Sequence, residues 1–173
     1  MEYKDLSDIR IETYRLSLRP ITLEYTEDIF REFTYEITAL MYPRPAKEIG
    51  ETEEFIRRSM KSIREGTDMQ MVILSKELEF LGCAGLHGLK SRQPELGVWL
   101  KRSAHGNGYG KEAIQAIKQW ASENLDYDHL LYPVAKNNAA SRKIAEALGG
   151  KIQRQYKQKG LGGNEYHCLE YHI

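Results

Sequence analysis

The densest group of chemically useful residues lies between positions 105 and 111, where the chain reads His-Gly-Asn-Gly-Tyr-Gly-Lys. Gly106, Gly108 and Gly110 have no side chains, so a bound anion could approach the backbone N–H groups closely. A pattern typical of a long helix follows, and the first turn of a helix adds unpaired N–H donors and a partial positive charge. The segment therefore predicts a phosphate-binding loop; the alternative is a flexible loop that only begins the helix.

Two common phosphate loops do not fit this segment. A Walker A loop that ends at 110–111 requires Gly where the chain has His105, and Ser or Thr where it has Glu112. A dinucleotide-binding fingerprint that starts at Gly106 requires Gly where the chain has Lys111. The loop must therefore bind phosphate in another structural context.

The elements that must position this loop follow from the spacing of apolar residues. Alternation predicts a strand over 14–21, and a three-to-four spacing predicts a helix over 23–41 that ends before Pro43 and Pro45. The remaining predicted elements are a helix that buries Phe55, Ile56, Met60 and Ile63 and ends at Gly66, strands over 69–74, 80–87 and 95–100, a helix over 113–125, a strand over 130–135, a helix over 139–148, and two strands in 151–173 around the turn at 160–163. This order predicts an α/β (α+β) domain with a mixed sheet.

Length and charge narrow the class of protein. The 173 residues contain 25 Lys and Arg against 25 Asp and Glu, so the formal net charge is zero, and we expect no nucleic-acid partner. No apolar run approaches the ~18 residues of a membrane span, so we expect a cytoplasmic protein without a membrane partner. Cys83 and Cys168 lack metal-ligand spacing and are expected to be reduced structural thiols. We expect one domain, 1–173, and no metal.

Four segments, in this order, resemble the GCN5-related N-acetyltransferase (GNAT) family, and particularly its ribosomal-protein N-terminal acetyltransferase branch. They are Tyr-Arg-Leu-Ser-Leu-Arg-Pro at 14–20, Glu-Leu-Gly-Val-Trp-Leu at 95–100, Gly-Asn-Gly-Tyr-Gly-Lys-Glu-Ala at 106–113, and Asn-Ala-Ala-Ser-Arg-Lys-Ile-Ala-Glu-Ala-Leu-Gly at 138–149. The resemblance covers nearly the whole chain. It implies a single-domain GNAT-like fold, with a mostly antiparallel sheet of about seven strands, about four flanking helices, and two central strands splayed apart.

The resemblance also implies acetyl-CoA as cosubstrate, held between the splayed strands. Its implied binding residues are Val98, Trp99, Leu100, His105, Gly106, Asn107, Gly108, Tyr109, Gly110, Lys111, Asn138 and Ser141. His105 departs from the family's Gln or Arg, but we expect binding to survive because the family's loop contacts are mainly through backbone amides. Pro133 supports the splay independently, since proline has no N–H for a sheet ladder; the alternative is that it marks a bulge or a sheet edge.

Acetyl transfer to an amine needs a group that accepts a proton, because a primary amine with a pKa near ~10 is almost wholly protonated at neutral pH. Glu95 resembles the family's general base, which acts directly or through water. The alternative for Glu95 is a solvated residue at a strand end. His87, at the end of the preceding predicted strand, is the competing base, and His105 is a weaker third.

The departing thiolate of CoA needs a hydrogen-bond donor, and many relatives use a Tyr seven residues after the family Asn. Here that Asn is Asn138, and the seventh residue after it is Ala145. Ser141 matches the Ser of the ribosomal-protein branch and is the predicted donor. The alternatives are that Ser141 caps a helix and that Asn138 is simply the helix N-cap.

The sequence does not identify the acetyl acceptor: a protein N-terminus, an amino acid, a polyamine or an antibiotic would each supply the amine. Tyr42 and His87 are the predicted acceptor-site residues. We expect direct transfer without a covalent enzyme intermediate, by a monomer or homodimer. The rival hypothesis is a non-catalytic acyl-CoA sensor or interaction module of the same fold, which the missing Tyr at position 145 keeps open.

Overall fold

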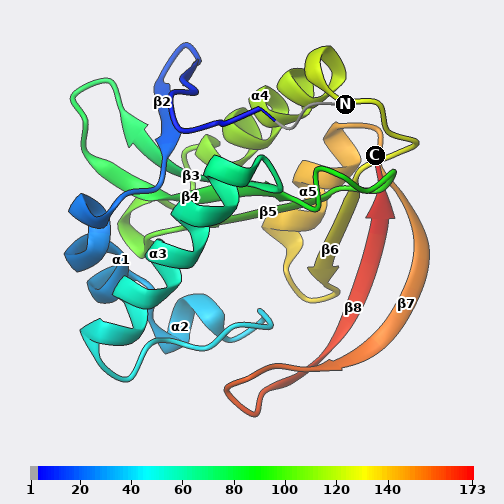
Figure 1. Ribbon diagram of the computed structural model, residues 1–173. Helices are drawn as coiled ribbons and strands as arrows, with labels where there is room; N and C mark the ends of the chain where they lie inside the picture. The colour runs from blue at the N-terminus through cyan, green and yellow to red at the C-terminus, as the bar shows by residue number, and fades with distance from the viewer. Residues whose placement is uncertain (1–3) are drawn as a thin grey trace.

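The computed structural model describes residues 4–173 (Figure 1). The described strands are β1 Ile11–Glu12, β2 Leu16–Pro20, β3 Asp68–Ser75, β4 Phe80–His87, β5 Glu95–Leu100, β6 Leu131–Ala135, β7 Lys151–Lys159 and β8 Glu165–His172. The described α-helices are α1 Thr26–Glu32, α2 Tyr35–Thr38, α3 Ile49–Glu65, α4 Tyr109–Asn124 and α5 Ala139–Ala147. Short 3₁₀ turns lie at Leu23–Tyr25 and Arg102–Ala104.

The eight described strands form one sheet in the order β1-β2-β3-β4-β5-β6-β8-β7. Neighbouring strands pair antiparallel except β5 and β6, which are parallel. Within the described chain these two strands share a single bridge, between Glu95 and Leu131. Beyond that bridge they diverge (Figure 1), so the predicted splay between two central strands is present and lies between β5 and β6.

Pro133 lies in β6 at a position where the sheet needs no N–H donor. Leu131 donates its N–H to the carbonyl of Pro94, 2.8 Å away and directly before β5. Backbone groups two residues apart point to the same side of a strand, so the nitrogen of Pro133 also faces β5, beyond the bridge. The pairing of β6 with β8 continues through Pro133 opposite Glu170 without a shift of register. The proline therefore marks the splay and no bulge in this pairing.

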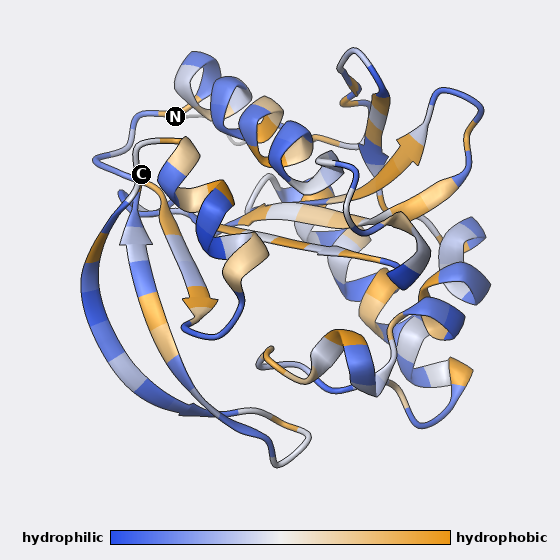
Figure 2. Cartoon of the chain, turned by 180° about the vertical axis from the view of Figure 1, so that it is seen from behind, coloured by the Kyte–Doolittle hydropathy of each residue, from blue (hydrophilic) through white to orange (hydrophobic). Residues whose placement is uncertain are grey.

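The helices cover the two faces of the sheet, with α1 and α3 on one face and α4 and α5 on the other (Figures 1 and 2). Helix α3 buries Thr52, Ile56 and Ile63, and it ends at Gly66, whose φ of 65° is a left-handed C-cap, as predicted. Phe55 differs from its prediction: it is 40% exposed because it faces a cavity rather than the core.

The region predicted as one helix over 23–41 is broken into a 3₁₀ turn, α1 and α2. Phe33 leaves the helical conformation at φ −86° and ψ 76°, and the Thr34 side chain accepts the N–H of Ile37 as the cap of α2. The apolar spacing continues across this break, so periodicity did not reveal it. This second helix, and a two-residue β1 too short to show a period, give five described helices and eight strands where about four and seven were predicted.

The remaining observations concern the cysteines, membrane-spanning helices and clusters of possible metal ligands. Cys83 and Cys168 are both free and buried, as predicted. No helix among residues 4–173 is long and apolar enough to cross a membrane. No group of three or more His, Cys, Asp or Glu residues in the described chain could hold a metal ion.

Candidate active site

Residues 105–111, which we call the glycine loop, lie after the open end of β5 and lead into α4. Gly106 and Gly108 have φ of 80° and 78°, a left-handed conformation that favours glycine. Gly108 is the N-cap of α4 and makes no side-chain cap, so the N–H donors of the first turn stay available to an anion. A Cβ at Gly106 would meet no protein atom within 4 Å. This open, donor-rich loop is suited to binding an anion.

Side chains of the loop hold its shape and leave its backbone exposed. The Nε2 of His105 lies 2.8 Å from the carbonyl oxygen of Leu100, the last residue of β5. The Nδ2 of Asn107 donates to the carbonyls of Ala104 and His105, at 3.2 and 3.1 Å. His105 thus ties the loop to the end of β5.

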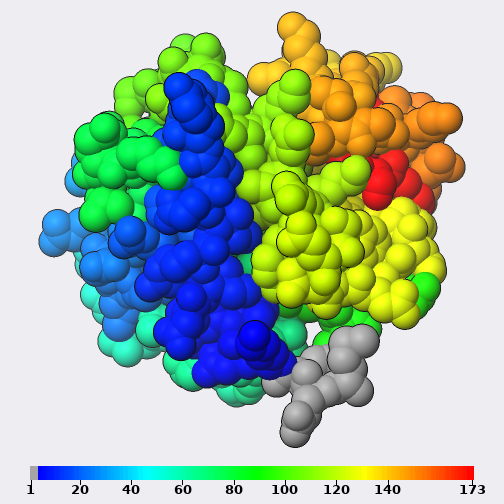
Figure 3. All heavy atoms as spheres, turned by 90° about the horizontal axis from the view of Figure 1, so that it is seen from above, coloured from blue at the N-terminus to red at the C-terminus, as the bar shows by residue number. Residues whose placement is uncertain are grey.

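A group of contacts that the sequence did not reveal joins the N-terminal segment to α4. It consists of Thr13, Arg15 and Glu112, and we call it the latch. One oxygen of Glu112 accepts from the Thr13 hydroxyl at 2.7 Å and the Arg15 N–H at 2.8 Å, and the other accepts from Arg15 Nε at 2.7 Å. Arg15 also donates to the carbonyl of Asn107 at 2.8 Å and lies 4.7 Å from the centre of the Tyr109 ring. Figure 3 shows the blue N-terminal segment against the yellow-green segment that contains α4. The latch therefore supports the glycine loop from outside.

The latch should make stability depend on pH. Burial raises the pKa of Glu112, but the hydrogen bonds from Thr13 and Arg15 outweigh it and lower the pKa below its ordinary 4.5. A carboxylate with a lowered folded-state pKa stabilises the fold above its unfolded-state pKa, and that contribution is lost as the pH falls through the folded-state value. We expect Glu112→Ala to lower the free energy of unfolding by about 1–3 kcal/mol at pH ~7, and by less well below pH ~4.5.

Urea unfolding of the wild type and of Glu112→Ala, at pH ~7 and well below pH ~4.5, measures this effect. Glu123→Ala, on the exposed face near the end of the same helix, is the matched control and should change little at either pH. An equal loss for Glu112→Ala at both pH values would show that the charge of Glu112 does not contribute.

A cross-strand row brings the candidate bases together. Asp68 of β3 lies opposite His87 of β4, His87 opposite Glu95 of β5, and Glu95 opposite Leu131 of β6. Directly opposite residues project to the same face of a sheet, so His87 and Glu95 are neighbours on one face at the closed end of the splay. The two residues that the sequence offered as alternative bases are therefore neighbours.

The surroundings of Glu95 and His87 shift the pKa values of both candidate bases. The side chain of Glu95 reaches solvent, yet burial by surrounding protein raises its pKa and the negative charge of the buried Glu170 raises it further. Burial lowers the pKa of His87, against the opposing effect of Asp68, whose Oδ1 lies 3.6 Å from His87 Nδ1. His87 is therefore neutral at pH ~7, while Glu95 holds its proton more readily than an ordinary glutamate.

Ser141 and Asn138 occupy the first turn of α5. Asn138 is the N-cap, and its Oδ1 accepts the N–H of Ser141 at 3.1 Å, so the predicted alternative for Asn138 is present. The Ser141 hydroxyl takes no part in that cap; it hydrogen-bonds to Tyr132, where burial raises the pKa of the phenol to about 12 and this bond opposes the rise. Tyr132 is a buried residue of β6 that sequence reasoning did not connect to the site.

Tyr42 lies in the loop between α2 and α3, with its side chain 51% exposed. Its carbonyl accepts the N–H of Leu161 at 2.7 Å, which ties this loop to the turn between β7 and β8. The neighbouring Met41 and Pro43 line a cavity of about 660 Å³ over β4 and β5, and His87 lines it too. Tyr42 is thus placed beside this cavity rather than in its wall.

A family model, a curated protein and several solved structures are similar to this chain. The acetyltransferase (GNAT) domain family matches residues 15–151. The uncharacterized N-acetyltransferase p20 of Bacillus licheniformis is 25% identical over 156 residues, which are 86% of this chain and 88% of that protein. A putative ribosomal-protein-serine acetyltransferase from Vibrio cholerae is similar in structure, with a TM-score of 0.80 and 20% identity over 96% of this chain and 98% of that one.

Spermidine N-acetyltransferase from Vibrio cholerae, solved with CoA and spermine, also has a TM-score of 0.80, with 16% identity over 93% of this chain and 96% of that one. The chain belongs to the GNAT acetyltransferase family. It is an acetyl-CoA-dependent N-acetyltransferase.

Proposed function

We propose that the chain is one acetyltransferase domain that moves an acetyl group from acetyl-CoA directly to a primary amine of a small molecule or a protein N-terminus. The observation that carries the proposal is the splay between β5 and β6. Its closed end is the Glu95–Leu131 bridge, and the glycine loop follows its open end. A cosubstrate that spans this length has its phosphates at the loop and its reactive end near Glu95.

Acetyl-CoA supplies an activated acetyl group as a thioester. The backbone N–H groups of 106–111 are the proposed donors to the pyrophosphate. The backbone of 98–100, freed from β6 by the splay, is the proposed partner of the pantetheine amides. His105 and Asn107 hold the loop in shape through the contacts described above.

Glu95 is the proposed general base. Its raised pKa brings the carboxylate closer to the pKa of the ammonium group whose proton it accepts, directly or through water, and this improves proton transfer. His87 is the alternative base, because it is neutral and lies directly opposite Glu95 on the same face. Glutamate is preferred because it stands at the bridge between β5 and β6, nearest to the splay.

Ser141 is the proposed hydrogen-bond donor to the sulfur of the leaving thiolate. Helix α5 covers the face of β6 opposite to Glu95, so a donor here approaches the splay from the other side. The buried Tyr132 hydroxyl behind Ser141 stays protonated at neutral pH because of its raised pKa. It can therefore keep the Ser141 hydroxyl oriented.

Two substitutions test the role of Ser141. We expect Ser141→Ala to lower turnover and Ser141→Cys to retain part of it, because a thiol is a weaker donor in the same place. Ser141→Ala should cost less stability than loss of the α5 cap, since that cap comes from Asn138 and Ser141 contributes only its contact with Tyr132. Turnover and melting temperature are measured on the same samples.

Asn138→Ala is the control for capping and should cost about 1 kcal/mol of stability. If Ser141→Ala instead loses that much stability and keeps normal turnover, Ser141 is only a structural residue of the helix.

A steady-state assay of CoA release over a panel of amines tests the proposed function. An enzyme releases CoA only when a suitable amine is present, and the amine gains one acetyl group. The rival acyl-CoA sensor would bind acetyl-CoA tightly and release no CoA with any amine.

A further inference from the structure

The cavity of about 660 Å³ is built against the same strand that borders the splay. Its floor includes Gly85 of β4 and Gly97 of β5, which lie opposite each other. A Cβ at Gly97 would meet no protein atom within 4 Å, so the floor is open there. The cavity also reaches His87, the cross-strand neighbour of Glu95. A group held in the cavity would therefore extend from an amine at the two candidate bases.

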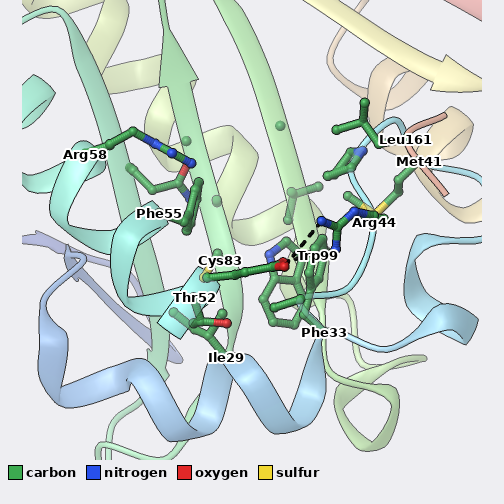
Figure 4. A pocket seen from close by; sticks show the side chains of 18 of the residues that line it. Ile29, Phe33, Met41, Arg44, Thr52, Phe55, Arg58, Cys83, Trp99 and Leu161 are labelled. Carbon is green, nitrogen blue, oxygen red and sulfur yellow. Dashed lines mark hydrogen bonds and ion pairs between the residues drawn. The ribbon is translucent and has the colours of Figure 1, made fainter. Parts of the chain in front are cut away.

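The walls of the cavity are aromatic and apolar (Figure 4). Phe33 and Trp99 pack against each other with ring centres 4.8 Å apart and planes inclined at 45°. Phe55 of α3 faces the same space, and its 40% exposure shows that part of the residue is open to solvent there. Leu161 enters from the turn between β7 and β8 and is 60% exposed. Such walls favour an apolar ligand group, which would cover surface now in contact with water.

The charged side chains of the lining neutralise one another. Arg44 lies 3.0 Å from Glu51, and Arg58 lies 3.3 Å from Glu54. His87 is the remaining titratable imidazole of the lining, and it is neutral at pH ~7 because burial lowers its pKa. Among the described lining residues, each carboxylate therefore already has a cationic partner.

We propose that this cavity receives the side group of the acceptor and selects primary amines that carry an aromatic or branched apolar group. The inference rests on the proposed acetyl transfer and names its substrate class. A polyamine would place additional ammonium groups against apolar walls and already paired carboxylates, and it would lose hydration without a new partner. A ring would cover Phe55 and contact Trp99.

Binding to the CoA-loaded protein tests the selection without turnover. We expect calorimetry to give 2-phenylethylamine an affinity at least about tenfold higher than ethylamine, because burial of the ring is the only difference. We also expect it to bind at least about tenfold more tightly than spermidine. Spermidine that binds as tightly as 2-phenylethylamine, or a ring that adds nothing over ethylamine, overturns the inference.

Two variants locate the selection in the cavity. Phe55→Ala should weaken 2-phenylethylamine several-fold and leave ethylamine unchanged, because it removes one wall. Ile49→Ala is the matched control, since Ile49 is also 40% exposed and on α3 but outside the lining. Arg44→Met frees the Glu51 carboxylate and should shift preference toward spermidine. Equal effects of Phe55→Ala and Ile49→Ala, or no shift with Arg44→Met, contradict the inference.

Turnover of the same amines separates this inference from the proposed function. Tight but unproductive binding of 2-phenylethylamine supports the apolar cavity and contradicts acetyl transfer to these amines. Acetylation of all the amines without preference for the ring contradicts the cavity's role and supports acetyl transfer. A tripeptide that begins with Phe, compared with 2-phenylethylamine, shows whether a protein N-terminus or a small amine is the better source of the same group.

Discussion

Replacement of Gly108 by valine should weaken acetyl-CoA binding more than tenfold while the protein still folds. Gly108 has φ of 78°, which a β-branched residue adopts only with strain of about 1–3 kcal/mol. The space around it is not the obstacle, because a Cβ would lie 3.5 Å from a nitrogen of Arg15, an ordinary contact. The strain instead rotates the loop amides, and each lost charge-assisted hydrogen bond costs roughly 1.5–3 kcal/mol.

Calorimetric titration of acetyl-CoA into the folded variant measures the loss. Gly149→Val is the matched control, because Gly149 has φ of 81° and lies after α5, away from the loop. Because the strain is similar, Gly149→Val should lower the melting temperature by a similar amount. It should leave the affinity for acetyl-CoA unchanged. Unchanged affinity for acetyl-CoA in Gly108→Val would show that this loop does not bind the pyrophosphate.

Glu95→Gln should lower turnover by about 10²- to 10⁴-fold at neutral pH and leave acetyl-CoA affinity near that of the wild type. The substitution keeps the shape of the side chain and removes only its ability to accept a proton. Wild-type turnover should rise with pH as Glu95 loses its proton, with the midpoint above the ordinary 4.5 because its pKa is raised. The variant should lack this limb and recover partly at high pH, where more of the amine is neutral.

The pH profiles of kcat for wild type and variant, measured with one amine, test this prediction. Glu165→Gln, an exposed carboxylate at the start of β8, controls for a change of charge alone. Full activity of Glu95→Gln at neutral pH would assign proton transfer to His87. The matching double variant, His87→Asn with Glu95→Gln, would then lose the activity that the single variant kept.

The fold could be predicted closely where the apolar periodicity agrees with the residues that end helices and strands. Strands β4 and β5 begin and end at the predicted residues, because each is a short apolar run bounded by polar or turn residues. Gly66 ends α3 as predicted. The break at Phe33 and Thr34 could not be predicted from spacing, because α1 and α2 keep their apolar residues in a continuous three-to-four rhythm.

The candidate site was predicted as separate residues, and its connections were not. Glu95 and His87 were alternatives in sequence because the row Asp68–His87–Glu95 depends on the register of three strands. The ion pair of Arg15 with Glu112 joins residues 97 positions apart, and no local pattern signals such a contact. Phe55 shows the same limit: helical spacing placed it on the apolar face of α3, and only the tertiary structure shows that Phe55 lines a cavity.

A single-turnover experiment tests the central claim most directly, namely that the splay between β5 and β6 is where acetyl-CoA meets an amine. Enzyme in excess over acetyl-CoA is mixed with and without 2-phenylethylamine or spermidine, quenched rapidly, and examined by mass spectrometry. We expect unmodified protein without amine, and with amine one acetylated product for each CoA released, at a rate that Glu95→Gln slows at least about 100-fold. Bound acetyl-CoA that stays intact with every amine, or an acetyl group found on the protein, would contradict direct transfer at this site.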